Sequence, residues 1–236
     1  MCWNMEASAT LAAVGLGSTA YAAYKGEDIR IWATLGYFSL MEALQAYTYT
    51  VIDDCAAPAN QIATVLGYLH IAFQPFLINL ISLYFIPQHV ARKIVVPVFT
   101  LVAICTVLYI LPIYPFEFVK PCDPGNNVFC SERLCSISGD WHIAWGMPRV
   151  EFWYGSSPYI IATFALPIIY GSWRFTLYHF FTGPLLAWFT TGNLNEFAAV
   201  WCLYSIGLLL IVAKTPVRKY LHVTRWTFYG KSGSLN

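Results

Sequence analysis

Two apolar segments in the first third of the chain, residues 31–52 and 61–86, constrain the fold most strongly. Each is long enough to cross the hydrocarbon core of a bilayer, about 30 Å thick. Polar side chains lie well inside both segments: Glu42, Gln45 and Tyr49 in the first, and His70 and Gln74 in the second. Ionisable and amide side chains are costly to hold in hydrocarbon. We therefore expect an integral, multi-pass membrane protein with a polar site between its helices.

The composition favours the same class. The chain is 58% hydrophobic and only 11% charged, whereas an average soluble domain carries ~25% charged residues. Its 13 basic and 12 acidic residues give a net charge of +1. Nucleic-acid binding needs a basic face, so we expect no nucleic-acid partner. The lipid bilayer is the expected partner.

The hydropathy pattern predicts an all-α fold, a polytopic bundle of seven transmembrane helices. The seven apolar segments are Ala7–Tyr24, Ile31–Ile52, Gln61–Ile86, Ile94–Ile113, Ser157–Trp173, Phe175–Thr191 and Phe197–Ala213. Pro158 and Pro167 are expected to break the fifth segment. The first segment follows no basic stretch of the kind that opens a secretory signal, so we expect it to be retained. Its small residues Ala9, Ala13 and Gly17 share one helical stripe and predict close packing there.

The basic residues predict the orientation, because cytoplasmic loops are enriched in Lys and Arg. With seven spans, one side collects ten basic residues: Lys25, Arg30, Arg92, Lys93, Arg174, Lys214, Arg218, Lys219, Arg225 and Lys231. The other side holds Lys120, Arg133 and Arg149. The amino terminus is therefore expected outside and the carboxyl terminus in the cytoplasm. Acidic side chains on the outer face, Glu196 among them, are expected to be solvated.

Two units follow from this arrangement: a transmembrane domain over residues 1–216, including the outer loop 114–156, and a cytoplasmic tail over residues 217–236. The tail mixes basic and aromatic residues directly after the last span. Such a segment is typical of binding to anionic lipids of the inner leaflet, where each basic residue contributes about 1 kcal/mol.

Four cysteines share the outer face: Cys55, Cys122, Cys130 and Cys135. An oxidising outer compartment favours two disulfides, and three pairings are open. A metal site is the alternative, but the spacings lack a C-x-x-C pair. The aromatic stretch that follows, DWHIAWGMPRVEFWYG, is expected to form a short amphipathic cap at the membrane interface.

The polar residues of the second and third segments predict one shared site. Glu42, Gln45 and Tyr49 lie on one face of a helix, and His70 and Gln74 lie on one face of the next. Antiparallel packing then allows a polar track that opens outward. His142, in the outer loop, and His179, near the inner end of the sixth segment, are expected to be interfacial histidines with ordinary partners.

Several functions suit such a site. One is transport, conduction or sensing of a small ligand, an ion or a proton, with Glu42 titrating and His70 as its proton partner. Another is a membrane-embedded enzyme, in which Glu42 and His70 do acid–base work or hold a metal, and Cys2 or His142 closes over the site. The catalytic residues of such an enzyme, and any cofactor, are not specified by the sequence.

Two further alternatives need no activity at this site. Glu42 can be a neutral carboxyl that joins two helices by hydrogen bonds. The chain can also be a non-catalytic subunit, with another membrane protein or a second copy of itself as partner. No retinal is expected, because the last segment contains no lysine for a Schiff base. It contains no histidine pair of the kind that alkaline-ceramidase-type zinc hydrolases need either.

Three motifs carry a resemblance to a known family. The opening MCWNMEAS, LMEALQ in the second segment and LHIAFQPFLIN in the third resemble a family of uncharacterised multi-spanning membrane proteins that begin Met-Cys-Trp and occur in bacteria and large DNA viruses. The resemblance covers mainly the first 90 residues and implies no activity. It implies that six residues belong together: Cys2, Trp3, Glu42, Gln45, His70 and Gln74.

Overall fold

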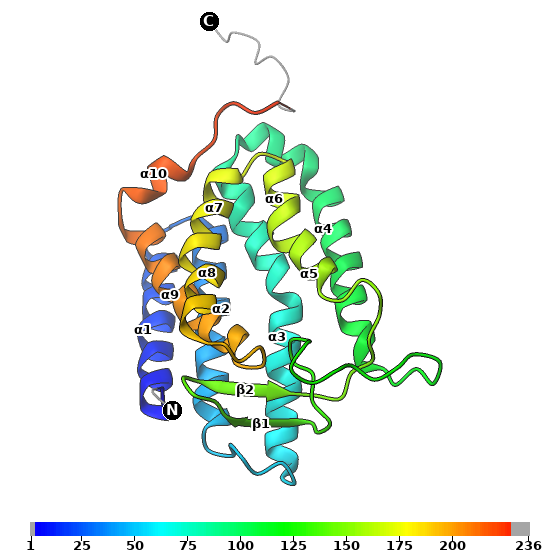
Figure 1. The fold of residues 1–236 in the computed structure, drawn as a ribbon. Coiled ribbons are helices and arrows are strands. Elements are labelled where there is room, and N and C mark those ends of the chain that lie inside the picture. The colour runs from blue at the N-terminus through cyan, green and yellow to red at the C-terminus, as the bar shows by residue number, and fades with distance from the viewer. Residues whose placement is uncertain (1–2, 228–236) are drawn as a thin grey trace, which may run out of the picture.

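The computed structural model describes residues 3–227 and is mostly helical (Figure 1). The helices are α1 (Met5–Tyr24), α2 (Ile29–Thr48), α3 (Pro58–Ser82), α4 (Gln88–Ile110), α5 (Ser157–Ile160), α6 (Leu166–Ile169), α7 (Trp173–Thr182), α8 (Pro184–Thr190), α9 (Phe197–Lys214) and α10 (Val217–Leu221). Short 3-10 turns extend α3 to Phe85 and α4 to Ile113. By length and composition, three of these rods could cross a membrane: Pro58–Phe85, Gln88–Ile113 and Phe197–Lys214.

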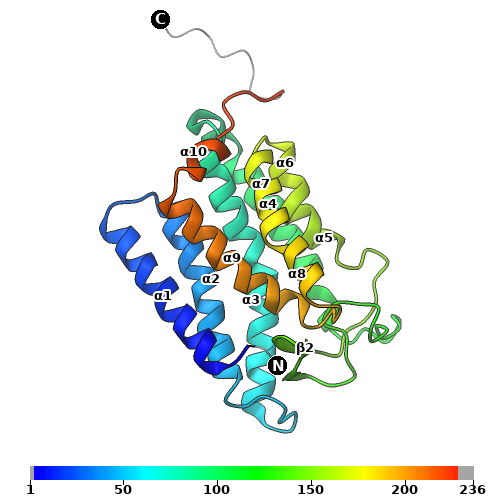
Figure 2. The same cartoon turned by 60° about the vertical axis from the view of Figure 1, so that its left-hand side comes forward.

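The first two helices lie side by side over most of their length (Figure 2). Their contact uses Ser8, Ala12, Gly15 and Ala22, which are buried. A Cβ atom on Gly15 would lie 2.2 Å from the Ser39 hydroxyl oxygen, so glycine is required for this close approach. The predicted stripe of Ala9, Ala13 and Gly17 is wrong, because all three are exposed. A helix this rich in small residues offers several such stripes, and composition alone does not select the one that packs.

The apolar segment 157–169 is one continuous helical rod with an irregular centre, so its prolines do not break it as expected. Between α5 and α6 the chain forms a π-helical turn over Ile161–Ala165. Pro167 has no N–H to continue the regular pattern. The Asn79 side-chain amide, on α3, donates to the Ala162 carbonyl at 2.8 Å and so stabilises the irregular turn. The turn therefore depends on a contact between helices.

The next rod is broken at Gly183, between α7 and α8. A Cβ atom at Gly183 would lie 2.7 Å from the Trp201 indole nitrogen. The absence of a side chain at this position lets α9 pack directly into the break.

The outer loop contains a β-hairpin, which corrects both the all-α expectation and the predicted amphipathic cap. β1 (Cys135–Ser138) pairs antiparallel with β2 (Ile143–Gly146), and Cys135 lies opposite Gly146. All four residues of β2 are buried, so the stretch has no polar face for an interfacial helix to expose. Trp145 packs in the core instead, whereas Trp153 is 95% exposed.

Two disulfides fix the loop, as the four outer cysteines predict. Cys55 pairs with Cys135, and Cys122 pairs with Cys130. The first bond ties the α2–α3 connection to β1, and the second closes a short segment within the loop. Cys105 and Cys202 are free and buried.

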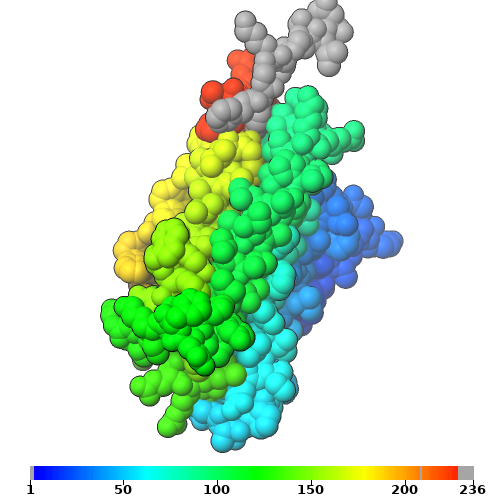
Figure 3. Space-filling view, turned by 90° about the vertical axis from the view of Figure 1, so that its right-hand side faces the viewer, coloured from blue at the N-terminus to red at the C-terminus, as the bar shows by residue number. Residues whose placement is uncertain are grey.

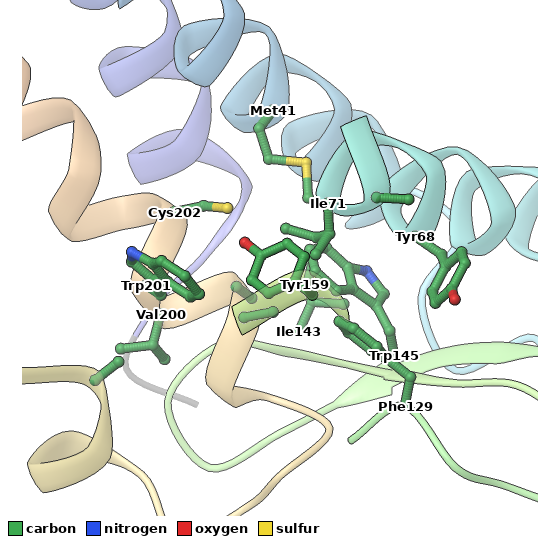
Figure 4. Packing of buried hydrophobic residues seen from close by; sticks show 14 of the residues in the cluster. Met41, Tyr68, Ile71, Phe129, Ile143, Trp145, Tyr159, Val200, Trp201 and Cys202 are labelled. Carbon is green, nitrogen blue, oxygen red and sulfur yellow. The ribbon is translucent and has the colours of Figure 1, made fainter. Parts of the chain in front are cut away.

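An aromatic core joins the hairpin to the helices (Figure 4). It contains Trp145 of β2, Tyr68 of α3, Tyr159 of α5 and Trp201 of α9, together with Phe129 of the loop. Each of these side chains is at least 94% buried. The hairpin is thus part of the main hydrophobic core, although it lies at one end of the molecule.

The C-terminal segment packs against the opposite end of the bundle (Figure 1). The Arg218 guanidinium pairs with the Glu27 carboxylate at 2.7 Å, and Arg174 donates to the carbonyls of Tyr220 and His222. The first eleven residues of the predicted tail, 217–227, therefore lie against the helix ends. The rest of that prediction, residues 228–236, lies outside the described part of the chain.

Candidate functional site

Glu42 and Gln45 form the centre of the site, one turn apart on α2 and both fully buried. One terminal atom of the Gln45 amide faces the Glu42 carboxyl group, 3.1 Å from Oε2 and 3.0 Å from Oε1. On the other side, Ser8 and Trp3 are hydrogen-bonding neighbours of the carboxyl group. The Trp3 indole N–H also donates to the Ser8 hydroxyl at 2.7 Å. The start of the chain and α1 therefore close one side of the Glu42 pocket.

His142 enters the site from the outer hairpin. Its Nε2 lies 3.3 Å from the same Gln45 amide atom, and its Nδ1 lies 3.1 Å from the Tyr49 hydroxyl. The Ile143 backbone N–H donates to Nδ1 at 2.8 Å. Since Nδ1 accepts that bond, the proton of the neutral ring is on Nε2, facing Gln45.

The hairpin histidine is held neutral by its surroundings. Its ring is 1% exposed, and the Trp3 and Tyr49 rings stack on it with centroid distances of 5.8 Å. Burial lowers the pKa of His142 to about 3, because desolvation penalises the charged ring. His142 is therefore a polar member of the site and not the interfacial residue that the sequence predicted.

Glu196 holds the hairpin in place from the start of α9. Its Oε1 accepts the backbone N–H of Trp141 at 2.5 Å and also that of His142. Its Oε2 accepts the Thr191 hydroxyl at 2.6 Å. The prediction that Glu196 is solvated is wrong, because the side chain is fully buried. Its three donors compensate for the lost water.

Two of the predicted site residues lie elsewhere. The His70 ring stacks on Tyr37 at a centroid distance of 3.9 Å, and the Gln74 carbonyl oxygen accepts the Tyr159 hydroxyl at 2.6 Å. Within residues 3–227, no hydrogen bond or ring contact joins either side chain to Glu42. In the same region, Nε2 of His70 and Nε2 of Gln74 are buried without a hydrogen-bond partner. In the described structure Glu42 therefore lies with Gln45 and His142, and Gln74 with Tyr159, in different hydrogen-bonded groups.

The described structure contains no cluster of side chains that would support the alternative of a metal site. Among residues 3–227, no group of three or more His, Cys, Asp or Glu side chains is arranged to hold a metal ion. Cys2, which the resemblance grouped with the site, lies outside the described residues.

Sequence reasoning missed Glu196 and named His142 at the site only in the enzyme alternative, because both residues reach the site across long distances along the chain. A weak signal exists for Glu196: it follows Asn193 and Asn195 directly before an apolar span, and three polar residues there suggest a turn that needs buried partners. Gly139 lies where the hairpin and Glu196 approach each other closely. A Cβ atom there would lie 2.6 Å from the His142 carbonyl oxygen and 2.7 Å from Glu196 Oε1.

The assembled groups can bind and move protons. A carboxyl group, an amide, an imidazole and a phenol follow one another from α2 to the hairpin. Each can donate or accept a hydrogen bond in at least one state, which is the chemistry of a proton relay or a switch. Glu42, Gln45 and His142 are at most 1% exposed, so the carboxyl group has no contact with bulk water.

Comparison with known proteins adds a family but no activity. A family of unknown function, DUF5765, matches residues 6–222. No curated protein sequence and no solved structure matches the chain. The match covers both ends of the site, from Ser8 to Glu196, and the chain belongs to the DUF5765 family.

Proposed function

We propose that the protein is a seven-span membrane protein in which protonation of the Glu42–Gln45–His142 site controls transport or sensing of a small solute or ion. The seven spans would be α1, α2, α3, α4, α5 with α6, α7 with α8, and α9. The observation that carries the functional part is the Gln45 amide, which contacts the carboxyl group of α2 and the imidazole of the outer hairpin at once.

Charge and cysteine placement support the orientation. Arg30, Arg174 and Arg218 lie at the end of the bundle that carries α10, where they contact helix termini and connecting segments. Both disulfides lie at the opposite end, beside the hairpin. An inner face rich in basic residues and an oxidising outer face are what the positive-inside rule and disulfide chemistry require.

The Gln45 amide links two proton sites through its orientation. When its oxygen faces Glu42 and His142, it accepts the Nε2–H of His142 and needs a protonated Glu42 as its second donor. When its NH2 group faces them, it donates to an ionised Glu42 carboxylate, but it then meets Nε2–H of the neutral histidine. Loss of the Glu42 proton therefore breaks the Gln45–His142 bond between α2 and the hairpin, while the Tyr49–His142 bond remains.

This coupling links the loss of the Glu42 proton to the position of the hairpin. The hairpin rests on Gln45 and Tyr49 through His142, and on Glu196 through its backbone. Ionisation of Glu42 removes the Gln45 contact and leaves the contacts of Tyr49 and Glu196 with the hairpin. A local charge change that biases a packed element between two positions is the usual basis of a protonation switch.

A second candidate function is a membrane-embedded enzyme that uses Glu42 and His142 as an acid–base pair. The bridged carboxyl and imidazole groups favour it, because general acid–base catalysis needs such groups within hydrogen-bond reach. We place it second because, among the described residues, no side-chain nucleophile with an adjacent base lies at this site.

The deciding experiment is an infrared pH titration of the purified protein in lipid nanodiscs. We expect a neutral carboxyl band that disappears as the pH rises, together with a change in the fluorescence of the tryptophans that flank His142. Glu42→Gln should remove the titrating band, and Glu6→Gln, an exposed outer carboxyl on α1, should leave it intact. A carboxyl band that never titrates between pH 4 and pH 9 would show that Glu42 only joins helices.

Transport can then be separated from catalysis. Proteoliposomes that contain a trapped pH-sensitive dye report proton entry after an external acid pulse. Entry that is fast in the wild type, slow in Glu42→Gln and unchanged in Glu6→Gln supports transport. A titrating band without proton entry favours sensing or the acid–base enzyme.

A further inference from the structure

A second site lies on another face of the outer end, between the loop and the ends of α3 and α4. It is a cavity of about 380 Å³ with apolar walls that include Val65 of α3, Ile113 at the end of α4 and Leu134 of the loop. This volume is within the usual range for pockets that hold small ligands. Figure 3 shows the face on which α4 runs along α3, with the loop beside the lower ends of both helices.

One charged residue, Arg149, lines this cavity. Its side chain is held in a fixed position: Nη1 donates to the Val128 carbonyl at 2.9 Å. The guanidinium lies over the Tyr68 ring at 5.3 Å and over the Tyr109 ring at 5.6 Å. The residue is 9% exposed. The cation is thus preorganised at the wall of an apolar cavity.

The charge of Arg149 has no counter-ion in the described chain. Among residues 3–227, the ion pairs are Arg30 with Asp28, Lys120 with Glu151 and Arg218 with Glu27. Glu151, two residues along the chain, is therefore already paired with Lys120. A nearly buried cation without an anion is costly, and ring faces compensate for only part of that cost. The missing partner is an anion.

The position of the cavity indicates which kind of molecule carries that anionic group. Ile113 ends the apolar rod Gln88–Ile113, and Val65 lies two turns inside the rod Pro58–Phe85. Both rods are long and apolar enough to cross a membrane. The cavity therefore begins at the level of lipid headgroups and extends along hydrocarbon, while Arg149 belongs to the loop outside.

We propose that this cavity binds an anionic lipid of the outer leaflet, with the phosphate of its headgroup on Arg149 and the start of an acyl chain against Val65, Ile113 and Leu134. Arginine suits a phosphate because its planar guanidinium offers several N–H donors to neighbouring oxygens. The apolar walls then exclude a purely polar anion. This inference needs the membrane location but not the Glu42 switch.

The test is lipid retention by the full-length protein. Protein reconstituted in nanodiscs of dioleoylphosphatidylcholine with 20% dioleoylphosphatidylglycerol, as the probe composition, is released into the gas phase and its bound lipids are weighed. We expect the wild type to retain phosphatidylglycerol in preference to phosphatidylcholine. Arg149→Gln should reduce that preference roughly tenfold, as expected for loss of charge-assisted hydrogen bonds.

Two further variants keep the test decisive if Arg149→Gln does not fold. Val65→Trp fills the cavity and leaves the arginine in place, so it should also abolish the preference. Arg133→Gln removes an exposed arginine of the same outer face and should leave the preference unchanged. Equal losses in Arg133→Gln and Arg149→Gln would overturn the proposal in favour of general surface charge.

A soluble anion provides the last control. Glycerol 3-phosphate carries the headgroup chemistry without an acyl chain, and thermal unfolding of the detergent-solubilised protein reports its binding. We expect phosphatidylglycerol to raise the unfolding temperature and glycerol 3-phosphate to leave it unchanged. Stabilisation by glycerol 3-phosphate alone, or no preference for phosphatidylglycerol in the wild type, would show that the site does not bind a lipid.

Discussion

The Glu196 carboxylate accepts the backbone N–H of His142, so the first turn of α9 determines where the outer hairpin places its histidine. The contact joins residues 54 positions apart along the chain. It explains why a carboxylate at the end of an apolar helix is buried and not solvated. It also makes the geometry of the Glu42 site depend on a residue that does not contact Glu42.

Replacement of Glu196 by glutamine should destabilise the protein. A glutamine side chain has one acceptor oxygen, whereas the carboxylate accepts from Trp141, His142 and Thr191. One donor or more is then left unpaired, which costs about 1–3 kcal/mol. Chemical denaturation in detergent measures the loss. Glu132→Gln, at an exposed carboxyl of the same loop, should have little effect, and equal losses in both variants would contradict the role of Glu196.

Replacement of Gly139 by alanine should displace the hairpin. The added Cβ atom would lie within 2.7 Å of the His142 carbonyl oxygen and the Glu196 carboxylate, and such overpacking costs about 1–3 kcal/mol. Gly192→Ala is the matched control, since no atom lies within 4 Å of its added Cβ. Thermal unfolding should separate the two variants. An unchanged unfolding temperature in Gly139→Ala would mean that the hairpin is loosely held.

Acid should weaken the fold through His142. The pKa of this residue is about 3 in the folded protein, against ~6.5 for a free histidine. Between these values the unfolded state binds more protons, so the free energy of unfolding falls as the pH drops from ~6.5 towards 3. The slope from one such group is at most about 1.4 kcal/mol per pH unit.

Substitution of His142 tests whether this residue causes the pH dependence of the free energy of unfolding. In denaturation series between pH 7 and pH 4, His142→Gln should give a flatter profile than the wild type, because glutamine does not titrate. His89→Gln, at an exposed position, should keep the wild-type slope. Identical slopes for all three proteins would place the acid sensitivity in other groups.

The two disulfides should contribute unequally to stability. Cys55 and Cys135 are 80 residues apart, whereas Cys122 and Cys130 are 8 apart. In the chain-entropy model, the longer loop gives about 4 kcal/mol and the shorter about 2 kcal/mol. Paired Cys→Ser variants, compared by denaturant unfolding, test the order. Peptide mapping without reduction should recover the same two pairings, and any crossed pair would contradict the fold of the loop.

Reporter fusions test the seven-span orientation. Fusions after Tyr24, Ile86 and Ala213 should all read as cytoplasmic, because each lies at the end that carries the basic residues. A fusion within residues 123–129, in the outer loop, should read as external. A cytoplasmic signal there, or an external one after Ala213, would contradict the proposed topology.

The sequence was sufficient for the helical character of the chain and for part of the site. Apolar runs gave the helices, and helical spacing put Glu42, Gln45 and Tyr49 on one face of α2, where the structure has them. These are local properties, set by side chains three or four positions apart.

The rest depends on packing between distant segments. The rotation of α3 about its axis was not predictable, and it stacks the His70 ring on Tyr37. The hairpin and the disulfide pairing also follow from the arrangement of α2, α3 and the loop in space. A histidine in a loop carries no periodic signal, so only the folded arrangement shows that His142 completes the site.

The Cys55–Cys135 disulfide has a consequence for how the chain can thread through a bilayer. A covalent bond between two cysteines requires both to be on the same side, so the segment between them must cross the membrane an even number of times. That segment contains α3 and α4, two long apolar rods. The Glu27–Arg218 ion pair likewise requires an even number of membrane crossings between α1 and α10. If α3 crosses the membrane, α4 must return, and no odd count between these residues is compatible with the folded protein.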